Sequence, residues 1–214
     1  MKNMRLTVCI GIMCGWLAAG MLHAGTRPDH VRPVEEDGSH LWLPVIRPVE
    51  GAEVEITYKG KVSPTIAIAI AELKNAWKGD PVLLEKKKTG RGDGFAITSS
   101  EHQVRILSST ETGLLYGVYS LLRMQAAGQL TVPLSVTEQP AYDLRILNHW
   151  DNPDGTVERG YAGRSLWNWE ELPGTLSPRY EAYARANASV GINGTVLNNV
   201  NASPQVLTLV VWRK

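Results

Sequence analysis

Short runs of alternating hydrophobic and polar residues fill the first half of the chain, and each run has the length of a strand. The run at 53–58 is the clearest, with Val54, Ile56 and Tyr58 alternating with three polar residues. Alternation with this period places the apolar side chains on one face of a sheet. Further strands are predicted at 40–46, 82–84, 94–99 and 103–107.

Two helices are predicted between these strands. Ser63-Pro64 is a helix start, because serine caps the first turn and proline lacks only an N–H that would be unpaired there. Residues 65–77 also alternate like a strand, but the cap and the helix-forming residues that follow favour a helix ending near Gly79. The second helix, at 112–125, should cover a sheet with one apolar stripe. This stripe consists of Leu114, Leu115, Val118, Leu121 and Leu122.

Beyond Pro140 the pattern changes to strand, long polar loop, helix and strand. The predicted elements are a strand at 144–147, a helix at 179–190 and a strand at 192–197. Ser177-Pro178 repeats the helix start, and Gly191 is placed to end the helix. This order is the repeat of a parallel barrel, in which the polar clusters after both strands lie on one face.

Residues 1–24 have the pattern of a secretory signal. The basic residues Lys2 and Arg5 precede an apolar stretch at 6–21. Ala24 then ends a plausible cleavage site. An uncleaved anchor is the alternative, although an apolar stretch of about 16 residues is short for a membrane span. We therefore expect export to the periplasm or the extracellular space, with no membrane contact once the leader is removed.

The composition permits one large or two small domains and argues against several classes of partner and site. The chain has 214 residues, of which 43% are hydrophobic and 20% charged, so most of it can bury a core. Its formal net charge of +1 argues against nucleic acid or an anionic membrane as the main partner. Both cysteines, Cys9 and Cys14, lie in the leader, so the rest of the chain has no disulfide and no thiolate metal site.

The loop that follows the strand at 144–147 carries the densest set of ligand-type groups. Between Asn148 and Arg164 it holds amides, carboxylates, arginines, a histidine, a tyrosine and Trp150. Aromatic rings beside hydrogen-bonding groups suit a sugar, which offers flat CH faces and hydroxyls. The alternative is a hydrogen-bonded structural loop with Trp150 as a plug in the core.

The spacing within this loop does not favour catalysis or metal binding. Asp151, Asp154 and Glu158 lie in one loop, whereas carboxylates that act across a sugar, roughly 5 to 9.5 Å apart, usually come from different strands. His149, Asp151 and Asp154 offer suitable atoms for a metal but no matching ligand spacing. We therefore expect neither a catalytic pair nor a metal site in this loop.

Two long segments of the second half are chemically unusual: ILNHWDNPDGTVERGYAGRSLW at 146–167 and RYEAYARANASVGINGTVLNNVNA at 179–202. They resemble the start of the catalytic barrel in glycoside hydrolase family 67, the α-glucuronidases of xylan breakdown. Upstream, GLLYGVYSLLRMQ at 113–125 and the pairs Asp37-Gly38 and Leu41-Trp42 resemble the same family. The resemblance covers essentially the whole chain after the leader.

The resemblance implies an α/β protein with a small N-terminal α/β sandwich, followed by the first two β/α units of an incomplete TIM barrel. The domains are then a signal at 1–24, a non-catalytic domain at 25–140 and the barrel start at 141–214. The family pattern is lost after Ser203, so we expect a truncated α-glucuronidase. A TIM barrel needs about 250 residues, so the two predicted barrel strands of this chain should not form a closed barrel.

For function, the resemblance implies inverting hydrolysis of α-1,2-linked 4-O-methylglucuronic acid from xylo-oligosaccharides, without cofactor or metal. It assigns Trp150 to the glucuronic acid pocket. It assigns hydroxyl or carboxylate contacts to Asp151, Arg159, Asn198 and Asn199, for which a loop-fixing hydrogen bond or ion pair is the alternative. The family's catalytic acid and base lie on later barrel strands, so we expect no catalytic residue and no turnover.

The expected partner is a glucuronic-acid-bearing xylo-oligosaccharide, and the sequence does not indicate an oligomeric state. Two other functions stay open. The N-terminal domain could act alone as a carbohydrate-binding or scaffolding module. A different glycosidase with a similar front domain, such as a hexosaminidase, is the second alternative.

Overall fold

The computed structural model describes residues 54–172 and 174–197. The predictions for the signal at 1–24, the strand at 40–46 and the segment 198–214 lie outside these residues. In the part described, the structure is a mixed α/β fold with a five-stranded sheet, a separate pair of strands and three helices. The α/β class expected from the sequence is therefore confirmed.

The five-stranded sheet has the order β1-β2-β4-β3-β5. Its strands are β1 (Ile56–Tyr58), β2 (Val82–Lys86), β3 (Phe95–Ser100), β4 (Gln103–Ser108) and β5 (Ser135–Glu138). Strands β1, β2 and β4 run parallel, whereas β3 is antiparallel to both β4 and β5. The first four strands were predicted, although β1 is shorter than the alternating run, and β5 was missed.

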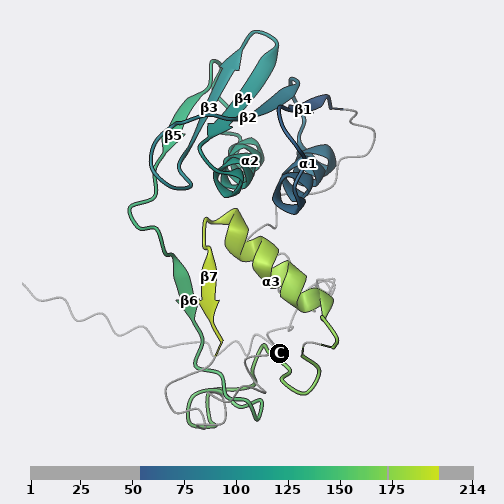
Figure 1. The fold of residues 1–214 in the computed structure, drawn as a ribbon, viewed down its shortest axis with the longest axis vertical. Coiled ribbons are helices and arrows are strands. Elements are labelled where there is room, and N and C mark those ends of the chain that lie inside the picture. The colour runs from purple at the N-terminus through teal and green to yellow at the C-terminus, as the bar shows by residue number, and fades with distance from the viewer. Residues whose placement is uncertain (1–53, 173, 198–214) are drawn as a thin grey trace, which may run out of the picture. The chain divides into compact units, whose positions relative to one another are not determined.

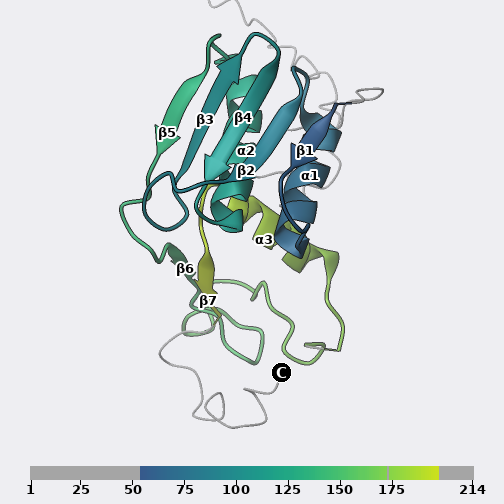
Figure 2. The same cartoon turned by 45° about the horizontal axis from the view of Figure 1, so that its top comes forward.

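Helices α1 (Pro64–Ala76) and α2 (Glu111–Ala126) lie side by side on one face of this sheet (Figures 1 and 2). The predicted start of α1 is confirmed, because the Ser63 hydroxyl accepts a hydrogen bond from the Ile66 N–H at 3.3 Å. Thr110 caps α2 in the same way. The apolar stripe predicted for α2 is fully buried between the sheet and α1.

Two glycines allow α2 to lie unusually close to the sheet. A Cβ atom at Gly117 would be 2.5 Å from the Ile106 side chain, and one at Gly113 would be 2.1 Å from the Ser108 hydroxyl. Both distances are shorter than atoms can approach without displacement. The glycines, four residues apart on one helix face, therefore set the separation between α2 and strands β3 and β4.

The second half forms a β-α-β unit. Strands β6 (Ile146–Asn148) and β7 (Gly194–Val196) pair in parallel, with α3 (Pro178–Ser189) between them in the chain. Ser177 caps α3, as predicted. The order of strand, loop, helix and parallel strand is confirmed. The structure shows this one unit and does not by itself identify a TIM barrel.

The end of α3 shows why a glycine stands at position 191. Gly191 has φ +78° and its N–H donates to the Ala188 carbonyl at 3.0 Å. The Ile192 N–H donates to the Asn187 carbonyl at 3.0 Å. These two bonds form a Schellman motif, which satisfies the last carbonyls of the helix and turns the chain toward β7.

Replacing Gly191 with alanine should lower the free energy of unfolding by about 1 kcal/mol, because a Cβ atom is disfavoured at this positive φ. Urea denaturation of the whole chain measures the change. Gly191→Asn is the matched control, since asparagine tolerates the left-handed conformation and should cost less. Equal losses in the two variants would show that the backbone conformation is not the cause.

A partly buried ionic cluster ties α3 to α1 and α2. Arg185 of α3 donates to both carboxylate oxygens of Glu72 of α1, at 2.5 and 2.9 Å. The Tyr119 hydroxyl donates to the same carboxylate at 3.0 Å. Burial, with the charge of Glu72, raises the pKa of Tyr119, so the phenol stays a donor while the protein is folded.

Among the residues that the structure describes, no helix has the length and apolar character needed to cross a membrane.

Candidate functional site

The loop that follows β6 begins as a continuation of the two-stranded sheet. The His149 N–H donates to the Val196 carbonyl of β7 at 3.0 Å. The chain then reverses, with the Asn152 N–H bonded to the Thr156 carbonyl at 2.8 Å and the Glu158 N–H to the Trp150 carbonyl at 2.6 Å. The predicted site loop is therefore a hydrogen-bonded hairpin at the carboxyl end of β6.

Asp151 is buried and holds this hairpin together. Its side chain accepts hydrogen bonds from the Ser165 hydroxyl at 2.6 Å and the Leu166 N–H at 3.0 Å. Its other oxygen lies 3.5 Å from Nδ1 of His149. The residue is 4% exposed. Asp151 thus makes the loop-fixing hydrogen bonds that were the alternative to a ligand contact. Its contact with a ligand stays a prediction.

An aromatic cluster attaches the loop to α3 and β7. The Trp167 ring lies 5.1 to 5.6 Å from the rings of His149, Tyr180 and Tyr183. Nε2 of His149 is 2.5 Å from the Tyr183 hydroxyl, which is 3.2 Å from the Thr195 hydroxyl. These contacts run from the loop through the helix to the second strand, so the loop, α3 and β7 pack as one unit.

Sequence reasoning missed this cluster, although one signal was available. Tyr180 and Tyr183 stand three residues apart in the predicted helix, so they share one helix face. An aromatic pair on one face predicts that something packs there. The long loop before the helix supplies the packing partner, Trp167.

Trp150 differs from its two neighbours in the chain. His149 and Asp151 are turned toward the loop interior, whereas Trp150 is 46% exposed. The interpretation of Trp150 as a core plug is therefore wrong, and Trp167, 9% exposed, is the buried tryptophan of this region. Trp150 is therefore about half-exposed at a hydrogen-bonded hairpin.

The other predicted contacts are only partly placed. Arg159 is exposed and lies in the turn at 158–161, directly after Glu158, whose N–H is bonded to the Trp150 carbonyl. Asn198 and Asn199 lie outside the described residues. Trp150 and Asp151 thus lie in the hairpin and Arg159 in the turn that follows it, and whether they bind a ligand stays a prediction.

The remaining carboxylates of the loop have local partners. Asp154 accepts from both the N–H and the hydroxyl of Thr156, which lowers its pKa. Glu158 accepts from the Tyr161 hydroxyl at 2.8 Å, and this bond raises the pKa of the tyrosine. Within residues 54–172 and 174–197, no three histidine, cysteine or carboxylate side chains are grouped to hold a metal ion.

Comparison with known proteins finds a family model that matches the second half of the chain. Residues 124–214 match the glycosyl hydrolase family 67 middle domain. This match begins inside α2 and includes residues 204–214, so the expected loss of resemblance after Ser203 is not seen in it.

The similar curated proteins are fungal. The chain is 41% identical over 116 residues to a probable α-glucuronidase A of Aspergillus clavatus and 44% identical over 116 residues to that of Neosartorya fischeri. It is 40% identical over 115 residues to α-glucuronidase A of Aspergillus tubingensis. Each match covers 54% of this chain and 14% of the relative.

A solved structure supports the fold alone. A GH138 enzyme targeting pectin rhamnogalacturonan II superposes with a TM-score of 0.51 over 69% of this chain and 19% of that chain, at 16% identity. The family rests on the sequence matches. They confirm the resemblance: residues 124–214 match the middle domain of glycosyl hydrolase family 67, and the chain is similar in sequence to α-glucuronidases.

Proposed function

We propose that the hairpin after β6 forms one wall of the sugar pocket of an α-glucuronidase. The substrate is a xylo-oligosaccharide that carries α-1,2-linked 4-O-methylglucuronic acid, and hydrolysis inverts the anomeric centre. The half-exposed ring of Trp150 is the observation that carries this proposal. Its neighbours are bonded into the loop, so the ring is presented from a fixed backbone, which lowers the entropic cost of stacking on a sugar.

The same proposal includes the architecture. The unit β6–α3–β7 is taken as the first repeat of a TIM barrel, in which binding residues lie at the carboxyl ends of the strands. Trp150 stands at that end of β6. The division into a front domain at 25–140 and a barrel domain from 141, and export after removal of 1–24, complete the proposal.

No catalytic acid or base is assigned to the loop. Inversion needs two carboxylates about 6.5 to 9.5 Å apart, one to protonate the leaving oxygen and one to activate water. Asp151, Asp154 and Glu158 instead accept hydrogen bonds from groups of the loop itself. A turnover assay of the chain on an aldouronic acid should therefore show no release of glucuronic acid.

Replacing Trp150 with alanine should weaken binding of an aldouronic acid at least about tenfold, because a central stacking ring carries a large share of binding energy. Isothermal titration calorimetry on the whole chain measures the dissociation constant. Tyr142→Ala is the matched control: this exposed aromatic residue lies before β6, and its carbonyl contact to Arg145 is kept. Unchanged affinity in Trp150→Ala, or no binding by the wild-type chain, would contradict the proposal.

A further inference from the structure

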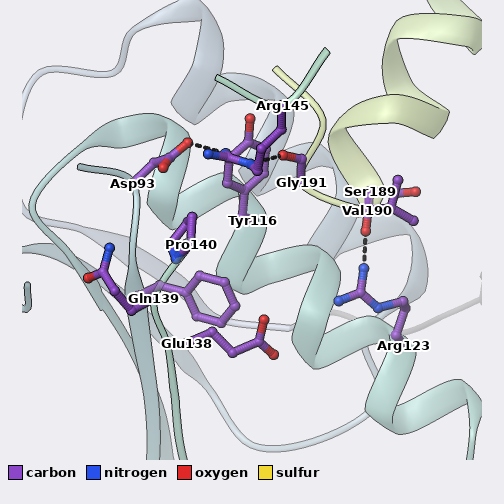
Figure 3. Close-up of a pocket in the computed structure, with 11 residues that line it drawn as sticks. Asp93, Tyr116, Arg123, Glu138, Gln139, Pro140, Arg145, Ser189, Val190 and Gly191 are labelled. Carbon is purple, nitrogen blue, oxygen red and sulfur yellow. Dashed lines mark hydrogen bonds and ion pairs between the residues drawn. The ribbon is translucent and has the colours of Figure 1, made fainter. Parts of the chain in front are cut away.

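A cavity of about 290 Å³ lies away from the Trp150 loop. Its lining comes from β3, α2, β5 and the end of α3, and includes Arg145 and Gly191 (Figure 3). Arg145 precedes β6 and Gly191 precedes β7, so the cavity is near the amino ends of these parallel strands. Trp150 follows the carboxyl end of β6, and the two places are therefore distinct.

One wall of the cavity is fixed by Arg145. Its guanidinium donates to Asp93 at 2.5 Å, to the Gly191 carbonyl at 2.5 Å and to the Tyr142 carbonyl at 2.8 Å. It also lies over the Tyr116 ring, 5.5 Å from the centroid. Because its donors are largely used, Arg145 closes this wall and is not the group that would receive a ligand.

Arg123 and Glu138 are different, because each retains unused hydrogen-bonding atoms. Nη1 of Arg123 donates to the Ser189 carbonyl, and Oε1 of Glu138 accepts from the Ser120 hydroxyl at 3.2 Å. Neither charge is in an ion pair with another described residue. The remaining guanidinium N–H groups and the second carboxylate oxygen are therefore available to a molecule in the cavity that both residues line.

This pair of groups selects the class of ligand. A strong donor and a strong acceptor that line one cavity suit adjacent hydroxyls, which can accept from one group and donate to the other. The carboxylate of Glu138 disfavours an anion, and the guanidinium of Arg123 disfavours a cation. Phe95 and Tyr116, which are 5% and 6% exposed, add apolar aromatic atoms to the lining. The chemistry is that of a neutral polyol with apolar CH faces.

The size of the cavity limits the ligand to about one ring. Pockets for drug-sized ligands span about 300 to 1,000 Å³. This cavity, of about 290 Å³, lies just below that range. We propose that it binds one neutral sugar unit through Arg123 and Glu138, at a second site separate from the Trp150 loop. The choice of a xylose unit as that sugar rests on the proposed function.

The whole chain titrated with xylotriose tests this site, because xylotriose lacks the glucuronic acid that the Trp150 loop is proposed to bind. In ¹⁵N-resolved NMR spectra the amides of Ser189, Val190 and Gly191 should shift with ligand concentration. Glu138→Ala should weaken binding about tenfold, since it removes a charged acceptor. Arg123→Gln should weaken it similarly, and its melting temperature shows whether loss of the Ser189 contact has disturbed the fold.

Thr137→Ala is the matched control, because it neighbours Glu138 on β5 and points to the other face of the sheet. It should bind xylotriose like the wild type. No shift at 189–191, or equal affinity in Glu138→Ala and Thr137→Ala, would overturn the inference. If either of these results were found and Trp150→Ala still weakened the binding of aldouronic acid, the second site would be rejected and the proposed function would be supported.

Discussion

Replacing Arg185 with alanine is expected to lower the free energy of unfolding by about 3 kcal/mol. The Glu72 side chain is 9% exposed. Without Arg185, the Tyr119 hydroxyl is the one hydrogen-bond donor left to its carboxylate among the described residues. A buried carboxylate that loses its counter-ion costs far more than the pair contributes when intact. Because the Arg185 side chain is itself 34% exposed, water can replace part of the contact, which places the loss at the low end of the range for buried pairs.

Urea denaturation followed by circular dichroism measures this loss. Arg179→Ala, at an exposed position of the same helix, is the control and should change stability by no more than about 0.5 kcal/mol. Combining Arg185→Ala with Glu72→Met should recover part of the loss, because the unpaired charge is then removed. If the Arg185 and Arg179 variants were equally stable, α3 would not depend on this cluster.

Replacing Gly117 with valine should cost about 3 kcal/mol, at the upper end of what overpacking causes. The new Cβ would be 2.5 Å from the Ile106 side chain and 3.3 Å from the Phe95 ring, both in the core. Relief requires α2 to move off the sheet, which disturbs the packing along its whole buried stripe. The change is measured as a shift in the urea midpoint.

Thr112→Val is the matched control for this variant, because it places the same side chain at an exposed position of the same helix. It should change the free energy of unfolding by no more than about 0.5 kcal/mol. Gly117→Ala should fall between the two, since the gain in helix propensity, about 1 kcal/mol, offsets part of the clash. A Gly117→Val variant as stable as Thr112→Val would show that α2 does not need its close approach.

Features with a local cause could be predicted from the sequence. The starts of α1 and α3 follow from Ser63-Pro64 and Ser177-Pro178, because a cap and its target N–H are separated by only a few residues. The end of α3 follows from Gly191 for the same reason. The four-residue strand β5 was missed because three of its residues are exposed, so the segment has little of the apolar character that marks a strand.

Features that join distant parts of the chain could not be predicted. Glu72 and Arg185 are separated by 113 positions, and no local pattern indicates that they meet. The candidate site shows the same limit. The sequence located the loop but did not indicate which tryptophan, Trp150 or Trp167, packs inside it. The exposure of Trp150 is a property of the packed loop and not of its neighbours in sequence.

The guanidinium of Arg145 has a consequence for the orientation of Trp150. It joins Asp93, in the turn before β3, to the Tyr142 carbonyl before β6 and to the Gly191 carbonyl before β7. Trp150 follows Arg145 by five positions, or about 17 Å of extended backbone, most of which is β6. A shift of Arg145 would therefore pass along β6 to the hairpin that carries the tryptophan. The contact between Asp93 and Arg145 thus helps to fix the start of the strand from which the Trp150 ring is presented.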